Sequence, residues 1–205
     1  MSPRRRKAED PDIFAALVRV MLRRGPAELT LREIAGEAGV TAGALVQRFG
    51  SKRALILAHA RHAAATGEAG LVSEPRTSSS PLGTLRTAAS MYASLAASPR
   101  AATRNLAYLL NDLGDPALRR HLLRMSRMAR AWYEQLLTDA IAAGEVQAGT
   151  EVRGLARLIE ATLRGSFLSW ALYREGASAQ WLREDLDSVL RPYLTDGDNR
   201  LRKRE

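Results

Sequence analysis

The sequence contains no cysteine and only three histidines in 205 residues. Without cysteine, the chain cannot form a disulfide, a Cys-ligated zinc site or a thiol nucleophile. His59 and His62 could share one face of a helix, but no carboxylate joins them at the spacing of a further metal ligand. We therefore expect no metal site and no cofactor, and we assign no catalytic residue.

Long apolar runs are also missing. No stretch approaches the ~20 apolar residues that a membrane-spanning helix needs, and no apolar signal-peptide segment follows the N-terminus. Hydrophobic residues nevertheless make up 46% of the chain, which is enough to bury a core. These features predict a cytoplasmic globular protein.

Acidic residues are fewer than basic ones, and the formal net charge is +9. Residues 1–60 hold eleven Lys and Arg against six Asp and Glu, and residues 197–205 hold four against two. This excess suggests an anionic partner such as nucleic acid. We expect residues 1–9 to form a disordered basic arm, which would either follow DNA phosphates or simply aid solubility, and residues 197–205 to form a basic tail.

The stretch TLREIAGEAGVTAGALVQRFGSKR, residues 30–53, predicts two short helices joined by a tight turn. Thr30 and Glu33 have the spacing of a capping box, and the apolar residues that follow recur at helical spacing. Gly39 would end the first helix in a left-handed conformation, and Thr41 would cap the second. A short helix, a glycine turn and a second short helix make a helix-turn-helix, whose second helix enters the DNA major groove.

This stretch resembles the DNA-binding signature of TetR-type bacterial transcriptional regulators, through T-L-R-E-I-A-x-x-A-G-V-T-x-G-x-L-x-x-x-F-x-S-K. The resemblance is specific over residues 10–58 and covers only helix order beyond them. It implies an all-α fold with an N-terminal three-helix DNA-binding domain and a helical ligand-binding and dimerisation domain. Two positions depart from the family, which usually has an aromatic at Val46 and often a histidine at Arg48.

The motif register predicts which side chains meet DNA. Gln47 offers the donor and acceptor that suit adenine, and Val46 could contact a thymine methyl group. Gly43 would allow a close approach between helices. Phosphate contacts are expected from Thr30, Arg32, Arg48 and Lys52. The complete predicted DNA-binding set is Thr30, Arg32, Thr41, Ala42, Gly43, Ala44, Val46, Gln47, Arg48 and Lys52.

The chain divides into a DNA-binding domain over residues 10–66, a Gly-, Ser- and Pro-rich linker over 67–81 and a helical domain over 82–196. Asp10 is expected to cap the first helix, with Pro11 following it. Ser51 would begin a helix that reaches about Ala65. Later helices are predicted at about 81–97, 100–113, 117–143, 151–174 and 179–194, with no strand pattern.

The segment 151–174 is apolar on two helical faces, so it must be covered on two sides. A second subunit would supply the missing cover and make the protein a homodimer. The alternative is that this helix is central within its own subunit. The predicted dimer interface consists of Leu158, Ala161, Gly165, Leu168, Leu172, Leu182, Leu186, Val189 and Tyr193.

Large apolar residues and a few polar ones recur along the helical domain and predict a site for an apolar or aromatic effector. The predicted ligand-binding set is Met91, Tyr92, Leu95, Leu109, Asn111, His121, Met125, Met128, Trp132, Phe167 and Trp170. The function expected from these features is a ligand-released repressor that binds a pseudo-palindromic operator as a homodimer.

Two other functions stay open. A sequence-neutral DNA-coating protein would also suit the basic ends of the chain. A small helical enzyme is less favoured, because the sequence has no Gly-rich phosphate loop and no serine motif with a paired histidine. Asp185 and Asp187, two residues apart on a helix, would diverge rather than pair.

Overall fold

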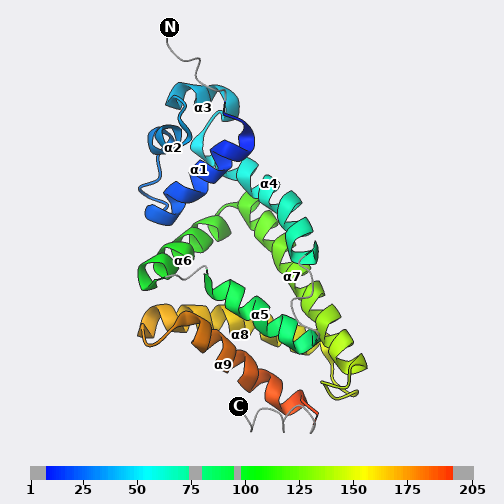
Figure 1. Ribbon diagram of the computed structural model, residues 1–205. Coiled ribbons are helices and arrows are strands. Elements are labelled where there is room, and N and C mark those ends of the chain that lie inside the picture. Colours follow the sequence, from blue (N-terminus) through cyan, green and yellow to red (C-terminus); the bar gives the residue numbers. More distant parts are fainter. Residues whose placement is uncertain (1–7, 74–79, 95–97, 196–205) are drawn as a thin grey trace. The chain divides into compact units, whose positions relative to one another are not determined.

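The computed structural model describes residues 8–73, 80–94 and 98–195, without the side chains of 64, 66–73, 91, 92 and 94. Over these residues the chain is helical apart from loops and one isolated β-bridge, so the predicted all-α class is confirmed. None of the helices in this part of the chain is both long and apolar enough to cross a membrane. In chain order (Figure 1) the helices are α1 (Asp10–Arg23), α2 (Leu31–Ala38), α3 (Ala42–Phe49), α4 (Lys52–Ser73), α5 (Pro81–Ser94), α6 (Pro99–Gly114), α7 (Pro116–Ala142), α8 (Val152–Tyr173), α9 (Ser178–Leu190) and the 3₁₀ helix η1 (Arg191–Tyr193).

The chain forms two compact units. Unit 1 contains the described residues up to Gly67 together with Arg104–Leu122, and unit 2 contains the described residues of Glu68–Thr103 and from Leu123 onward. Tyr108 of α6 is buried among the apolar side chains of unit 1. Its hydroxyl donates a hydrogen bond of 3.0 Å to the carbonyl oxygen of Arg24 at the end of α1.

The predicted caps of the helix-turn-helix are present. The hydroxyl oxygen of Thr30 accepts a hydrogen bond from the Glu33 N–H at 3.3 Å, and the Glu33 carboxylate accepts one from the Thr30 hydroxyl at 3.0 Å. Gly39 ends α2 with a φ of 69°. The Thr41 oxygen accepts from the Ala44 N–H at 3.1 Å and so begins α3. These caps are local, which is why the sequence pattern could predict them.

Some predicted helix ends are wrong. The α4 helix continues to Ser73, so the first half of the predicted linker 67–81 is helical, while 74–79 lies outside the described residues. A glycine costs a helix only about 1 kcal/mol, whereas the residue before a proline is driven out of helical geometry, and Pro75 is the first proline after Ser51. Asp10 is the first residue of α1 rather than its cap.

The core of unit 1 brings α1 to α4 together. Its buried apolar side chains are Ile13, Phe14, Leu17, Val20, Leu29, Ile34, Ala35, Leu45, Leu55 and Tyr108. The α3 helix contributes a single fully buried side chain to this cluster, Leu45, which is 1% exposed. One leucine therefore anchors α3 and leaves most of its surface outside the core.

The core of unit 2 is built from α5, α8, α9 and the later part of α7, with α9 lying alongside α8 in Figure 1. The inner face of α8 is buried through Leu155, Ile159, Leu163, Phe167 and Trp170. The loop after α7 is tied to the end of η1, since the Gln147 N–H donates to the Tyr193 carbonyl oxygen at 2.9 Å. Unit 2 is thus a leucine-rich helical core closed by its own C-terminal segment.

Candidate nucleic-acid interface

The exposed residues at the start of α3 are small, and larger exposed side chains follow them at Val46, Gln47 and Arg48. Thr41, Gly43 and Ala44 are exposed, and so are Gln47 and Val46, of which Val46 is 48% exposed. A Cβ added at Gly43 would meet only the Thr41 hydroxyl oxygen, at 3.9 Å. The predicted close helix approach at Gly43 is therefore wrong, and the missing side chain instead exposes the α3 backbone. A partner surface can therefore come close to the first turn of α3, and the larger exposed side chains of Val46, Gln47 and Arg48 follow that turn.

Two of the predicted phosphate ligands have partners within the protein. Arg48 forms an ion pair of 2.6 Å with Asp10, and its Nη1 donates to the Ala8 carbonyl oxygen at 2.8 Å. The guanidinium of Arg48 thus ties α3 to the start of α1, and the phosphate contact predicted for Arg48 stays a prediction. Lys52 donates to the Leu29 carbonyl oxygen at 2.9 Å. An ammonium group has three N–H donors, so Lys52 keeps donors for the phosphate contact that the sequence predicts.

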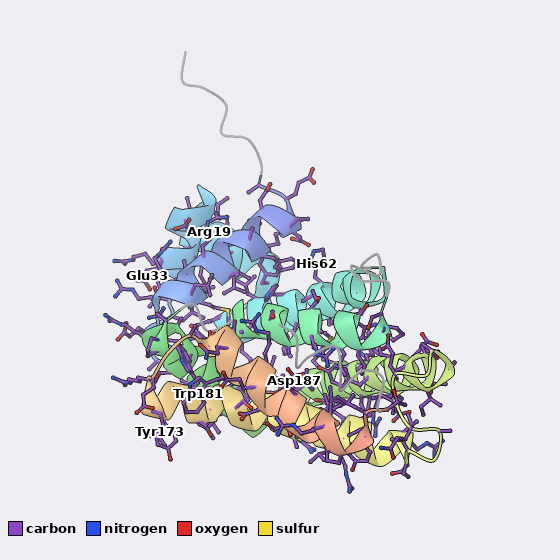
Figure 2. All side chains as sticks on the ribbon, turned by 60° about the horizontal axis from the view of Figure 1, so that its bottom comes forward. Arg19, Glu33, His62, Tyr173, Trp181 and Asp187 are labelled. Carbon is purple, nitrogen blue, oxygen red and sulfur yellow. The ribbon has the colours of Figure 1, made fainter. Side chains whose placement is uncertain are left out.

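Arg32 differs from other arginines of the helix-turn-helix region because it is exposed and forms no ion pair within the described residues. Arg19 and Arg23 of α1 (Arg19 is labelled in Figure 2) both contact Glu37 of α2, at 2.6 and 2.5 Å. These two contacts, with Arg19 the larger influence, hold the pKa of Glu37 below its usual value. One carboxylate thus serves two arginines of α1, whereas the guanidinium of Arg32 is exposed and has no ion pair within the described residues.

A bidentate ion pair fixes the start of α7 to the start of α4. Arg53 Nη2 lies 2.9 Å from Asp115 Oδ1, and Arg53 Nε lies 2.5 Å from Oδ2. The same Asp115 carboxylate caps α7 by accepting from the Ala117 N–H at 2.8 Å. The Arg53 hydrogen bond lowers the pKa of Asp115 to about 2, so the carboxylate is charged at neutral pH. This link joins residues 62 positions apart, and no pattern in the sequence predicted it.

His59 and His62 both pack on the ring of Phe14, with ring centroids 5.7 and 5.1 Å away. Burial lowers the pKa of His59, and the neighbouring His62 lowers it further. His59 is therefore held neutral beside α1, where it contributes to packing.

This burial predicts an acid-sensitive DNA-binding unit. Since the pKa of His59 is lower in the folded protein than its value of about 6.5 in an unfolded chain, stability is complete above that value and falls as the pH drops through it. For one proton, the free energy of unfolding falls by at most about 1.4 kcal/mol per pH unit. Urea unfolding at pH 7.5 and 5.5 measures it, and His59→Gln should reduce the difference. The matched His121→Gln variant should keep it; equal behaviour of the two variants would refute the assignment to His59.

The predicted ligand-binding residues do not gather in one unit. Leu109, Asn111 and His121 belong to unit 1, and Leu109 and Asn111 are exposed. Phe167 and Trp170 are buried in unit 2, where the Trp170 indole N–H donates to the Gly176 carbonyl oxygen at 3.2 Å. The remaining described members, Met125, Met128 and Trp132, are half-buried. Leu95 and the side chains of Met91 and Tyr92 lie outside what the structure describes.

The outer face of α8 is apolar and exposed. It carries Leu158, Ala161, Gly165, Leu168 and Leu172, all from the predicted dimer interface. Val189 and Tyr193, from the same predicted set, are half-buried.

The prediction is corrected at two positions of α9. Leu182 and Leu186 are 0% exposed within the core of unit 2, so they have no surface to offer a second subunit. Their spacing of four residues marks an apolar helix face, but the same spacing serves a subunit's own core equally well.

Comparison with known proteins identifies family models that match the chain. Residues 13–59 match the family model described as bacterial regulatory proteins of the tetR family, and residues 111–186 match the model of the tetracyclin repressor-like C-terminal domain. No curated protein matches the chain.

Solved structures share the fold. A TetR transcription regulator from Haloarcula marismortui is 14% identical with a TM-score of 0.75, covering 91% of this chain and 98% of its own. SmeT, the repressor of the Stenotrophomonas maltophilia multidrug efflux pump SmeDEF, is 22% identical with a TM-score of 0.68, covering 94% and 93%. FadR from Bacillus subtilis, in complex with stearoyl-CoA, is 18% identical with a TM-score of 0.67, covering 88% and 97%. With a capped helix-turn-helix inside one matched segment and a helical core in the other, the chain belongs to the TetR family of bacterial regulatory proteins.

Proposed function

We propose that this protein is a non-enzymatic transcriptional repressor that places α3 in the major groove of a pseudo-palindromic operator as a homodimer. The observation that carries the proposal is the surface of α3, which is anchored by one buried leucine and exposes small residues in its first turn, with Val46 and Gln47 exposed after them. Such a helix can approach base edges closely, and two of them in a dimer would read two half-sites about 34–36 Å apart. Its place of action would be the cytoplasm, where bacterial DNA lies.

Within this proposal the side chains of α3 contact the DNA bases, and the residues around α3 contact the phosphate backbone of the DNA. The Gln47 amide can bond adenine in two places, and Val46 can contact a thymine methyl group. Arg32 and the remaining donors of Lys52 meet phosphates, which set the register without reading sequence. Arg48 acts indirectly by holding α3 against the start of α1.

Two substitutions separate reading from positioning. Gln47→Ala should cost about 1–3 kcal/mol on the operator and relax preference at one base pair. Arg32→Ala should weaken operator and random DNA alike and reduce the slope of log K against log salt by about one. Fluorescence anisotropy over a salt series, with every single base change in the operator, measures both effects. Equal losses on operator and random DNA for Gln47→Ala would disprove the reading role.

A DNase footprint distinguishes the proposal from sequence-neutral DNA coating, which the basic ends of the chain favour. A repressor protects a discrete palindrome, whereas a coating protein protects DNA uniformly. Uniform protection at every concentration that shifts the DNA would reject the repressor function.

The homodimer is supported by the outer face of α8, where leucines and small residues lie side by side and open to solvent. An apolar helix face of this kind is typical of an interaction surface. Two copies meeting through it would cover both faces of α8, with Gly165 allowing close contact between the backbones.

We further infer that an apolar or aromatic small molecule releases the operator. SmeT is the repressor of a multidrug efflux pump, and FadR is in complex with stearoyl-CoA, a molecule with a long apolar acyl chain. Two features could transmit the signal: α4 and α7 each run from one unit into the other, and Arg53–Asp115 joins their starts. To weaken operator binding tenfold, the small molecule must bind the DNA-free conformation about 1.4 kcal/mol more tightly than the DNA-bound one. Native mass spectrometry should find a bound apolar molecule that Met125→Trp excludes while operator binding persists; a variant with unchanged binding would place the effector elsewhere.

A further inference from the structure

Two arginines share one buried carboxylate between α7 and α8. Glu160 of α8 is only 6% exposed, whereas Arg130 of α7 and Arg164 of α8 are 42% and 51% exposed. Arg130 donates from Nε and Nη2 to Glu160 Oε2, at 2.8 and 2.5 Å. Arg164 Nη2 lies 2.8 Å from the other carboxylate oxygen, Oε1. All three residues belong to unit 2, and the carboxylate holds the two guanidiniums together from their buried side.

The hydroxyl of Ser126, one turn before Arg130 on α7, adds a further donor. Its oxygen accepts a hydrogen bond from Arg164 Nη2 at 2.5 Å, and its hydrogen has no acceptor within the described residues. Each guanidinium has five N–H donors and uses at most two in these contacts, so at least three remain. The solvent side of the cluster therefore carries donors, and its one carboxylate faces inward.

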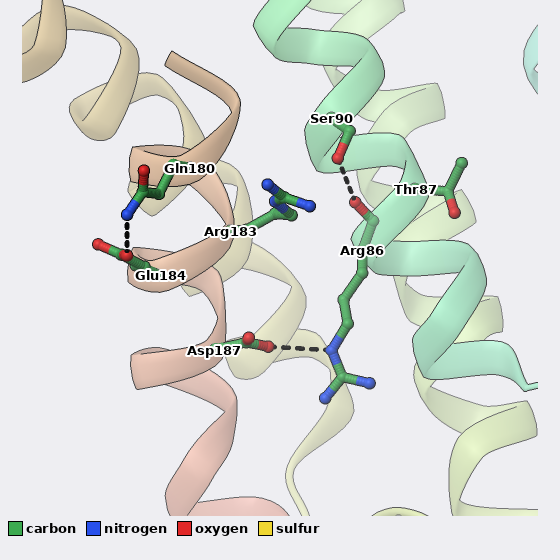
Figure 3. Close-up of a pocket in the computed structure, with 7 residues that line it drawn as sticks. All are labelled: Arg86, Thr87, Ser90, Gln180, Arg183, Glu184 and Asp187. Carbon is green, nitrogen blue, oxygen red and sulfur yellow. Dashed lines mark hydrogen bonds and ion pairs between the residues drawn. The ribbon is translucent and has the colours of Figure 1, made fainter. Parts of the chain in front are cut away.

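The groove between α5 and α9 in the same unit has a different balance of charge. This groove of about 470 Å³ is lined by Arg86, Thr87, Ser90, Gln180, Arg183, Glu184 and Asp187 (Figure 3). Two arginines face two carboxylates in this set, and Arg86 donates from Nε to Asp187 Oδ1 at 2.9 Å. Within the described residues, no carboxylate other than Glu160 forms an ion pair with Arg130 or Arg164. The cluster on Glu160 thus has one positive charge that its own carboxylate does not balance.

Neighbouring side chains increase this positive charge. Arg127 precedes Arg130 by three residues on α7. Arg157 likewise precedes Glu160 on α8, and residues three apart are neighbours on a helix surface. Arg127 and Arg157 are exposed and form no ion pair in the part of the chain that the structure describes. Glu134, four residues after Arg130, adds one carboxylate, so the cluster and these neighbours together carry two positive charges.

An oxyanion matches this arrangement. Arg130 and Arg164 contact the two oxygens of one carboxylate, so a second oxyanion with similar spacing of its oxygens can bridge them from the solvent side. A phosphate group carries about −1.5 to −2 charges at pH 7 and three strong acceptor oxygens, whereas a carboxylate carries one charge. We propose that Arg130, Arg164 and Ser126 bind a tetrahedral dianion, which is inorganic phosphate or the phosphate group of a small molecule.

This site is separate from the effector site and from the dimer face proposed above. Ser126, Arg130 and Arg164 belong to neither predicted set. Arg164 directly precedes Gly165 of the outer face of α8, but its guanidinium turns toward α7, where it contacts Ser126. The anion site therefore borders the dimer face without using its apolar side chains.

Titration of the full-length protein with sodium phosphate, at constant pH and with sodium chloride keeping the ionic strength constant, tests the proposal. In ¹H–¹⁵N spectra the Nε–H signals of Arg130 and Arg164 should shift saturably below about 10 mM, where a Kd of 1 mM would be nearly saturated. Sulfate should act in the same way, and acetate should bind at least about tenfold more weakly because it carries one charge. Glycerol 3-phosphate separates the two sources of phosphate: equal or weaker binding supports the free ion, and tighter binding supports a phosphate ester.

Two substitutions assign the contacts. Arg164→Gln should weaken phosphate binding about tenfold or more, since it removes a charge-assisted contact. Arg130→Lys keeps a positive charge beside Glu160 and loses the planar fork, so it should also weaken binding while the rest of the spectrum matches the wild type. Arg183→Gln is the matched control, because Arg183 is an exposed arginine of unit 2 that lines the groove between α5 and α9. It should bind phosphate as the wild type does.

Three results would overturn the proposal: no saturable shift with phosphate or sulfate, equal binding of acetate, or shifts confined to the helix-turn-helix. Unchanged phosphate affinity in Arg164→Gln would reject it as well. If the cluster serves only to join α7 to α8, Arg164→Gln lowers stability in urea but the wild type shows no response to phosphate. None of these measurements requires the operator or the dimer, so the proposed function stands or falls separately.

Discussion

Replacing Leu168 by glutamate is expected to make the protein monomeric and to lower operator affinity by about 10²- to 10⁴-fold. Leu168 is 55% exposed on the outer face of α8, so the change should not disturb the fold of one subunit. In the proposed dimer the same position would be covered, and a carboxylate there would lose its water without gaining a partner.

The loss is large because binding by a dimer is bivalent. The second recognition helix finds its half-site at a high effective concentration once the first has bound, and a monomer loses this advantage. Sedimentation equilibrium at micromolar protein measures the change in mass, and anisotropy on the full operator measures the change in affinity.

Leu110→Glu is the matched control, because Leu110 is also an exposed helical leucine, at 69%, but lies on α6. It should keep the mass and the operator affinity of the wild type. If Leu168→Glu remains a dimer, or if the wild type sediments as a monomer, the interface proposed on α8 is wrong.

Truncating Leu45 to alanine is expected to destabilise unit 1 by about 2–5 kcal/mol, the usual range for a buried leucine. Leu45 is 1% exposed and is the only fully buried side chain of α3. Its loss would leave α3 held mainly by Phe49, which is partly buried, and by the Arg48–Asp10 pair. Since total stabilities of domains are about 5–15 kcal/mol, the variant should also lose operator binding.

The neighbouring Val46→Ala variant should behave in the opposite way. Val46 is 48% exposed, so urea unfolding should change little, while affinity for an operator with thymine at the contacted position should fall. Urea denaturation and anisotropy on both variants therefore separate anchoring from reading. A stable Leu45→Ala protein with unchanged operator affinity would contradict the anchoring role.

The sequence by itself determined the order of the helices, the caps of the helix-turn-helix and the position of α3. Thr30, Gly39 and Thr41 act on backbone groups within four residues, and the apolar positions of α2 and α3 follow the helical period. Interactions of such short range depend on the local order of residue types, which the sequence displays directly. The exposed face of α8 was likewise visible in the pattern, as an apolar stripe beyond the one needed for the core.

Only the tertiary structure decided which charged and apolar side chains have partners within the protein. Arg48 meets Asp10, Lys52 meets Leu29 and Arg53 meets Asp115, and each of these contacts joins residues far apart in the sequence. Leu182 shares the spacing of an interface residue, yet it is fully buried in unit 2. The α5–α9 groove arises in the same way, since its two walls come from segments about ninety residues apart. Helical periodicity predicts which face of a helix a side chain lies on. Whether that face packs in the core or faces solvent depends on the tertiary structure.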